Sequence, residues 1–235
     1  MKALIFDCDG VLVDTERDGH RVAFNRAFAE AGIGAEWSVA LYGELLKVAG
    51  GKERMKHYFD EHGWPPGKTA GTLIPELHKR KTAIFTELVA SGSLPLRPGI
   101  TRIVDEAHAA GIRLGVCTTS DPKSVGGVLD LMGAERKSYF EIVLAGDVVA
   151  KKKPNPEIYL LAKERLDLPA RACVVIEDSR NGLLAATGAG MPCLITQSAY
   201  TQDEDFREAA SVVPDLGDPP NVRVTLKDLK AIASV

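Results

Sequence analysis

The sequence predicts an α/β protein, a doubly wound parallel sheet with a helical cap domain inserted after the first strand. Three observations predict this class. Residues 3–6 form a short apolar run, which is typical of a strand buried on both faces of a parallel sheet. Residues 17–94 give helical patterns, whereas helix and strand patterns alternate from residue 100 onward. We therefore expect a core domain of residues 1–16 and 95–235 and a cap domain of residues 17–94.

Local patterns justify these elements in chain order. The cap begins with a helix around residues 24–31 that Gly32 ends, and helical periodicity returns around residues 73–88. Pro95 marks a stiff connection back to the core. The expected core elements are helices around 100–107, 125–132 and 156–165, strands at 113–117, 142–145, 172–176 and 193–195, a strand near Val212 and a helix opened by the capping-box spacing Thr225-x-x-Asp228.

Composition limits the possible functions. The chain has 235 residues, of which 45% are hydrophobic, a normal value for a globular protein. A net charge of −3 and a pI near 6.0 argue against a nucleic-acid partner, which usually requires a basic excess. No leader-like segment and no apolar run of membrane-spanning length occurs, so we expect no membrane partner and a cytoplasmic protein. Cysteines 8, 117, 173 and 193 lack zinc spacing and are interpreted as reduced, buried thiols.

Polar residues follow four of the predicted strands. Parallel strands bring their carboxyl ends to one edge of the sheet, where α/β proteins bind ligands. Asp7 and Asp9, separated by one residue, would both lie at this edge, and two such close charges require a cation or a proton between them. The pattern predicts a Mg²⁺ site with one carboxylate free to attack. The other residues expected at this edge are Thr118, Lys153, Glu177 and Asp178.

These clusters resemble the four motifs of the haloacid-dehalogenase-like phosphatase superfamily. The first matches D-x-D-G-V-x-x-D-T-E, the second is a lone Thr after a strand, the third is the Lys of K-P-x-P, and the fourth is E-D-S. The resemblance covers nearly the whole chain and implies a Rossmann-like core with a cap. It also implies a Mg²⁺-dependent phosphoric monoester hydrolase that forms an aspartyl-phosphate.

The resemblance assigns a role to each motif. Asp7 is the nucleophile, and Asp7, the backbone carbonyl of Asp9 and Asp178 are Mg²⁺ ligands, with Glu177 acting through water. Lys153 and Thr118 bind the phosphoryl oxygens. The side chain of Asp9 protonates the leaving group and then activates water. Dehalogenases of the superfamily lack this second aspartate, so Asp9 favours phosphate chemistry.

Three residues near the motifs have roles that the motifs themselves do not decide. Glu16 is a candidate contact for a substrate hydroxyl. The family more often shows D-T-E-x-x-H, whereas here Gly19 fills the histidine position, so His20 is given no role. Lys152, like its neighbour Lys151, is interpreted as part of a solvated run.

Two loops are candidates for substrate binding. The stretch around Gly50, Gly51, Lys52 and Arg54 offers backbone N–H groups and two cations, a clamp for a second, distal phosphate. Its alternative interpretation is a flexible loop that opens a surface helix. The second loop contributes the candidate substrate-binding residues Thr119, Ser120, Lys123 and Ser124.

The overall pattern is most similar to the CbbY-like branch, whose members convert xylulose 1,5-bisphosphate to xylulose 5-phosphate. A β-phosphoglucomutase-like phosphoryl transferase, which shares all four motifs, remains an alternative. A receiver-like module phosphorylated on Asp is a rival from another class. The branch implies a small sugar phosphate as partner, and we expect a monomer located in the cytoplasm, or in the plastid stroma for a processed eukaryotic protein.

Overall fold

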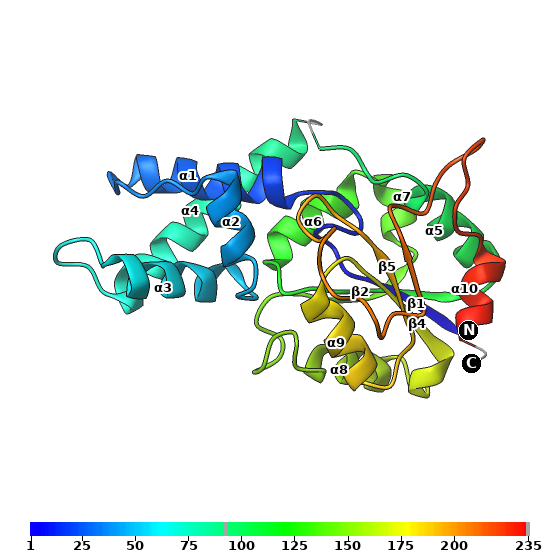
Figure 1. Ribbon diagram of the computed structural model, residues 1–235. Coiled ribbons are helices and arrows are strands. Elements are labelled where there is room, and N and C mark those ends of the chain that lie inside the picture. The colour runs from blue at the N-terminus through cyan, green and yellow to red at the C-terminus, as the bar shows by residue number, and fades with distance from the viewer. Residues whose placement is uncertain (92–93, 234–235) are drawn as a thin grey trace.

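The computed structural model describes residues 1–91 and 94–233. Within them, six strands form one parallel sheet in the order β3-β2-β1-β4-β5-β6 (Figure 1). The strands are β1 (Ala3–Phe6), β2 (Arg113–Cys117), β3 (Phe140–Leu144), β4 (Cys173–Glu177), β5 (Cys193–Thr196) and β6 (Ser211–Val213). The predicted fold class is confirmed, and each of the expected strands is present within a few residues of its predicted place.

The sheet order reverses at its centre. β1 pairs with β2 on one side and with β4 on the other, and Phe6 is in register with both Val116 and Ile176. The chain therefore winds outward from β1 through β2 to β3, and then outward in the opposite direction from β4. The carboxyl ends of β1, β2 and β4 lie together at this reversal, the point where doubly wound sheets bind ligands.

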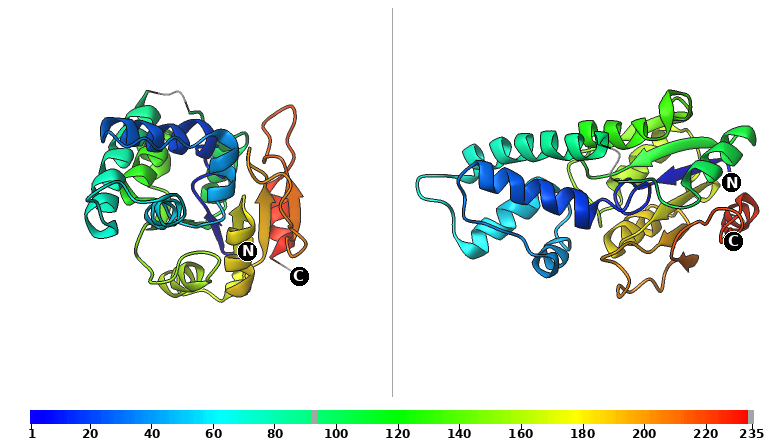
Figure 2. Two further views of the ribbon diagram at one scale, coloured as in Figure 1. Left: turned by 60° about the vertical axis from the view of Figure 1, so that its left-hand side comes forward. Right: turned by 90° about the horizontal axis from the view of Figure 1, so that it is seen from above.

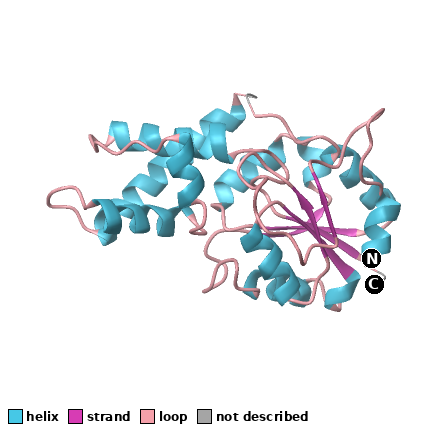
Figure 3. Cartoon of the chain, in the orientation of Figure 1, coloured by secondary structure: helices cyan, strands magenta, loops and turns pink. Residues whose placement is uncertain are grey.

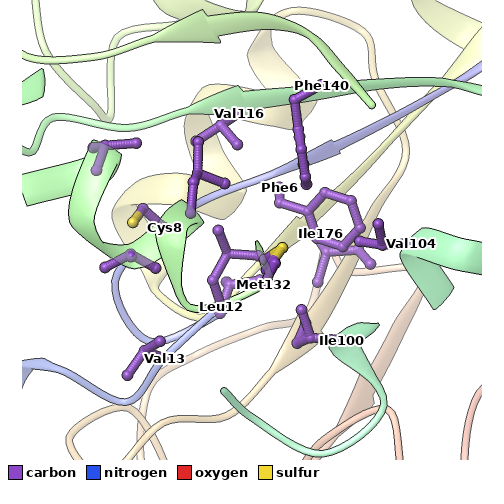
Figure 4. Close-up of a cluster of buried hydrophobic side chains, with 14 of the residues drawn as sticks. Phe6, Cys8, Leu12, Val13, Ile100, Val104, Val116, Met132, Phe140 and Ile176 are labelled. Atoms are coloured by element: carbon purple, nitrogen blue, oxygen red, sulfur yellow. The ribbon is translucent and has the colours of Figure 1, made fainter. Parts of the chain in front are cut away.

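Helices cover both faces of the sheet. On one face α5 (Ile100–Ala109), α6 (Pro122–Asp130) and α10 (Leu226–Ile232) pack on the side chains shown in Figure 4, with α7 (Gly133–Lys137) beside α6. On the other face α8 (Glu157–Arg165), the short η2 (Ala170–Ala172) and α9 (Arg180–Gly188) enclose a second apolar cluster. The capping box at Thr225 is present as predicted.

Among the described residues between β1 and α5, helices and loops occur but no strand of the sheet. The helices are η1 (Glu16–His20), α1 (Arg21–Glu30), α2 (Val39–Leu45), α3 (Gly51–His62) and α4 (Ala70–Ala90). We call residues 16–90 the helical lobe; it lies at the left in Figures 1 and 3. Its own core is aromatic and contains the buried residues Phe24, Phe28, Trp37, Tyr42 and Phe59.

The helical lobe connects to the sheet through two segments that lie side by side. Val13 forms an isolated bridge with Leu96, and the N–H of Arg97 donates to the carbonyl of Leu12 at 2.9 Å. The C-terminal half of α4 packs against α6, so the lobe is also fixed to one face of the sheet (Figure 2). The predicted domain boundary at residues 94 and 95 adjoins residues 92 and 93, which lie outside the described residues, and the boundaries stay a prediction. None of the described helices is both long and apolar enough to cross a membrane.

Candidate active site

A cavity lies between the carboxyl edge of the sheet and the helical lobe. The sheet side supplies Asp7, Asp9, Thr118, Thr119, Ser120, Lys153 and Asp178 to its wall. The helical lobe supplies Glu16, His20, Gly50, Gly51, Arg54, His78 and Lys81. The structure thus brings residues from all four predicted motifs to one place.

Lys153 is the central cation of the first cluster. Its Nζ lies 2.7 Å from Asp7 Oδ1, 2.5 Å from Glu177 Oε1 and 2.9 Å from the carbonyl oxygen of Cys117. Burial would lower the pKa of this ammonium, but the two carboxylates raise it above its ordinary value. Tyr159 donates a further hydrogen bond of 2.5 Å to Glu177 Oε1. Glu177 therefore orients Lys153, and Lys153 holds the carboxylate of Asp7.

The buried acids of this cluster outnumber its cation. Burial raises the pKa of Asp7 to about 7 despite the attraction of Lys153, with Glu177 and Asp9 adding to the rise. Burial, Glu177 and Asp7 also raise the pKa of Asp178 well above its usual range. One carboxylate oxygen from each of Asp7, Glu177 and Asp178 lies within 4.8 Å of the others. A set of hard oxygen donors with uncompensated negative charge fits a divalent cation such as Mg²⁺.

Gly10 permits this close approach. Its φ of +79° lies in the left-handed region, and a Cβ atom at this position would lie 2.0 Å from Asp178 Oδ2. Only glycine meets both requirements without strain. The glycine of the first motif thus brings the loop that carries Asp9 against the carboxylate of Asp178.

Asp9 has a different environment from Asp7. Its carboxylate accepts hydrogen bonds from the hydroxyls of Thr15 and Ser120, and His20 Nε2 lies 2.7 Å from Oδ1. Burial alone would raise the pKa of Asp9, but His20, Ser120 and Thr15 together hold it well below its usual range. Asp9 is therefore ionised in this arrangement.

His20 links Asp9 to a buried cation. Lys81 Nζ lies 2.7 Å from His20 Nδ1, and the ring stacks on Phe85 with centroids 3.9 Å apart. Burial lowers the pKa of Lys81 to about 8, although Asp9 acts to raise it. The three side chains form a buried chain, Lys81 to His20 to Asp9, which directs positive charge at the aspartate.

Sequence reasoning gave His20 no role because it stands one residue too late in the motif. The structure explains its position, because η1 is a π-helix of five residues, Glu16–His20. The N–H of His20 donates to the carbonyl of Thr15 at 2.7 Å, a bond across five residues. A π-turn contains one residue more than an α-turn and accommodates the extra residue. A histidine displaced by one from a helical motif was the available signal.

Hydrogen bonds position Thr118 and Glu16 at the wall of the cavity. Thr118 follows β2, its N–H donates to Leu144 O at 2.9 Å, and its hydroxyl oxygen accepts from the N–H of Ser120 at 3.2 Å. Glu16 accepts a hydrogen bond from the hydroxyl of Tyr42, and Arg54 donates to the same hydroxyl at 2.9 Å. Arg54, only 6% exposed, is thus occupied in positioning Tyr42 and Glu16.

Some of the remaining residues that were predicted to contact the substrate line the cavity, and others do not. Gly50, Gly51, Thr119 and Ser120 line the cavity, whereas Lys52, Lys123 and Ser124 are not among its lining residues. Lys52 forms an ion pair with Asp147 of the sheet side. Ser124 is buried, and its hydroxyl has no partner within the described part of the chain.

The interpretation of Lys152 as a solvated residue is wrong. Its side chain is 13% exposed, and its Nζ lies 2.7 Å from Glu53 Oε1 and 3.0 Å from Asp147 Oδ1. Glu53 belongs to α3 of the helical lobe, so this lysine ties the lobe to the sheet side. A run of three lysines in a sequence does not show that the middle one meets two acids from distant segments.

Comparisons with known proteins agree with this site. The sequence model of haloacid dehalogenase-like hydrolases matches residues 1–190. A CBBY-like protein of Arabidopsis thaliana is 51% identical over 230 residues, covering 95% of this chain and 72% of the relative. Protein CbbY of Cupriavidus necator is 44% identical over 224 residues, covering 93% and 87%.

Solved structures give the same result. A mutant CbbY from Rhodobacter sphaeroides, in complex with xylulose-(1,5)bisphosphate, has a TM-score of 0.88 and 39% identity over 97% of this chain and 99% of that one. A β-phosphoglucomutase from Clostridium difficile, 21% identical with a TM-score of 0.81 over 100% and 97% of the two chains, shows the fold alone. A phosphorylated carbohydrates phosphatase of Thermotoga maritima is 29% identical over 203 residues, 81% of this chain and 82% of the relative. The chain therefore belongs to the haloacid dehalogenase-like hydrolase family and is an enzyme of its phosphatase type.

Proposed function

We propose that this enzyme is a Mg²⁺-dependent phosphatase that removes one phosphate group from a small sugar phosphate through an aspartyl-phosphate on Asp7. The substrate we propose is xylulose 1,5-bisphosphate, which would give xylulose 5-phosphate. The observation that carries the reaction type is the convergence of Asp7, Asp9, Lys153 and Asp178 in one cavity. The complex of a CbbY relative with xylulose-(1,5)bisphosphate supports the choice of sugar.

The residues divide the chemistry between attack and charge compensation. Asp7, Asp178 and the backbone carbonyl of Asp9 would hold Mg²⁺, which supplies positive charge against the phosphate dianion. Asp7 attacks phosphorus, and the bond from phosphorus to the sugar oxygen breaks. Lys153 and Thr118 then share the charge of the equatorial oxygens. Glu177 contributes by orienting Lys153, from which it accepts a hydrogen bond of 2.5 Å.

Asp9 moves protons in both halves of the reaction. In the first half its protonated form would give a proton to the departing sugar oxygen, and in the second its carboxylate would take one from the attacking water. The contact between His20 Nε2 and Asp9 at 2.7 Å stabilises the carboxylate form. The carboxylate form is the one that would take a proton from water in the second half, the hydrolysis that distinguishes a phosphatase from a transferase.

The alternative is a phosphoryl transferase like the β-phosphoglucomutases, which share this fold. Such an enzyme would convert β-glucose 1-phosphate to glucose 6-phosphate without net release of phosphate. The receiver-like module is set aside because the chain is a family enzyme and carries Asp9 two residues after the nucleophile.

One experiment tests the proposal. Purified enzyme is incubated with Mg²⁺ and a panel containing xylulose 1,5-bisphosphate, other sugar phosphates and β-glucose 1-phosphate, and released phosphate is measured. We expect the highest kcat/KM with xylulose 1,5-bisphosphate and no turnover by Asp7→Asn. Release from no member of the panel refutes the proposal, and glucose 6-phosphate formed without released phosphate supports the transferase. Size-exclusion chromatography with light scattering checks the expected monomer.

A further inference from the structure

His78 is a cavity residue that none of the four motifs includes. It lies on α4 three residues before Lys81, and both side chains line the cavity. Residues at i and i+3 share a helix face and are separated by about 4.5 Å along the axis. Lys81 reaches toward Asp9 through His20, and the next apolar residues of α4, Ile84 and Phe85, join the core shared with the sheet. His78 therefore lies farther from the reacting groups, at the end of the cavity formed by the helical lobe.

The ring of His78 faces the first turn of α3. A Cβ atom on Gly51 would lie 3.6 Å from His78 Cδ2 and 3.7 Å from Nε2. The same atom would lie 3.2 Å from Phe24 Cζ, so the rings of Phe24 and His78 both border the backbone of Gly51. Gly51, which lines the cavity together with Gly50, thus adjoins the imidazole.

Burial and the surrounding cations keep the ring of His78 neutral. Burial lowers the pKa of His78 to about 4, and the cations Lys81, Lys52 and Lys152 act in the same direction against Asp121. A neutral imidazole has one N–H donor and one acceptor nitrogen. Neither nitrogen of His78 has a hydrogen-bond partner within residues 1–91 and 94–233. The ring is only partly buried and is available to a ligand in the cavity.

We propose that His78 binds the phosphate group that is not transferred, the distal phosphate of a sugar bisphosphate, and that it determines the preference for such substrates. The proposal rests on the proposed function. Lys52 and Lys152 are already paired with Asp147 and Glu53, whereas the N–H of His78 is unused. An anion placed between this N–H and the first turn of α3 meets donors from two helices. The residue that recognises the distal phosphate, His78, thus lies about one helical turn from Lys81, the first member of the series Lys81, His20, Asp9.

The test compares two substrates that differ only in the distal phosphate. Xylulose 1,5-bisphosphate and xylulose 1-phosphate are assayed with the wild type, His78→Leu and His78→Gln, and with His57→Gln as the control. His57 lies on the solvent-exposed side of α3 near Glu61. We expect His78→Leu to lose about 10- to 100-fold in kcat/KM for the bisphosphate, through KM, the range for a hydrogen bond to a charged group. We expect a change below about threefold for the monophosphate, and partial recovery in His78→Gln.

A second measurement uses the wild type and needs no variant to fold. Xylulose 5-phosphate, the expected product, retains the distal phosphate, so its binding should raise the pKa of the His78 ring in an NMR titration, whereas xylulose should not. Equal losses on both substrates, or no loss, overturn the role of His78. A wild type that hydrolyses neither substrate instead overturns the proposed function.

Discussion

Asp7 and Asp9 are separated by one residue in the sequence, and their pKa values are shifted in opposite directions. Burial raises the pKa of Asp7 to about 7, whereas His20, Ser120 and Thr15 overcome burial and lower that of Asp9. Here the difference arises from partners supplied by η1 and by the loop after β2.

His20→Gln tests how Asp9 is tuned. Removing the ring disconnects Asp9 from Lys81, so the carboxylate form loses stabilisation and its pKa rises. We expect kcat to fall by about tenfold or more, and the acid limb of the kcat profile to move to higher pH. His108→Gln, which alters a ring stacked on Tyr139 on the sheet side, is the matched control. An unchanged acid limb in His20→Gln would contradict this tuning.

Gly10→Ala tests the close approach between the first motif and Asp178. Gly67→Ala is the matched control, because Gly67 has a similar φ of +72° and nothing within 4 Å of an added Cβ. The control should lose about 1 kcal/mol of unfolding free energy and keep its activity. Gly10→Ala must also displace Asp178, and a shift of about 1 Å in a catalytic group can cost about 100-fold in rate. Steady-state kinetics and thermal unfolding are measured for both variants. Equal activities of Gly10→Ala and Gly67→Ala would show that activity does not need the close approach of Gly10 to Asp178.

At the scale of the elements, the sequence was sufficient for the sheet and insufficient for the helical lobe's contribution to the site. The buried run of β1 and the acids after β4 have local signals, because period and strand ends are read from neighbouring residues. The pairing of Lys152 with Glu53 has no such signal, and the one local sign of the π-turn of η1 is a histidine displaced by one residue from the motif. They depend on contacts between segments about 60 to 100 residues apart, such as His20 with Lys81. Hence the sequence was enough to predict a nucleophile, but not the groups that orient its neighbour Asp9.

Deleting Asp18 tests whether η1 accommodates one extra residue. The deletion shortens the π-turn to an α-turn and restores the spacing D-T-E-x-x-H, which leaves the histidine facing Asp9. Asp18 is exposed, so little packing is lost. We expect kcat within about threefold of the wild type, much closer to it than His20→Gln. Inserting one alanine after Asp18 is the companion variant and should reduce activity, because it rotates the histidine by about 100°. Loss of activity on deletion would show that the π-turn itself is required.

At the scale of the whole molecule, the candidate active site lies where the helical lobe meets the sheet side. Lys52 pairs with Asp147, Asn181 donates to the carbonyl of Lys47 at 3.2 Å, and Tyr200 packs where Gly43 lacks a side chain. Each contact joins the helical lobe to the sheet side. Exposed ion pairs contribute little individually. The several contacts together hold the lobe over the acids, and thereby keep Asp7 and Asp178 out of water.

We expect this burial to make the stability of the whole molecule depend on pH and on a bound divalent cation such as Mg²⁺. The pKa of Asp7 is raised from 3.8 to about 7 without metal, so the folded state binds more protons than the unfolded chain. The unfolding free energy of the metal-free enzyme should therefore fall as pH rises from about 4 to about 7. Mg²⁺ requires deprotonated carboxylates, so its stabilising effect should grow over the same range and up to pH 8.

Thermal unfolding in EDTA and in Mg²⁺, at pH 6 and at pH 8, measures this dependence. Mg²⁺ at 100 times its dissociation constant contributes about 2.7 kcal/mol, which corresponds to about 5–10 °C in Tm for a chain of this size. We expect that shift at pH 8 and a smaller one at pH 6, because the protons on Asp7 and Asp178 must first be released. Asp178→Asn removes one ligand and should abolish most of the shift while raising Tm in EDTA, since it removes a buried carboxyl. A shift that is independent of pH, or that persists in Asp178→Asn, would place the metal elsewhere than among these acids.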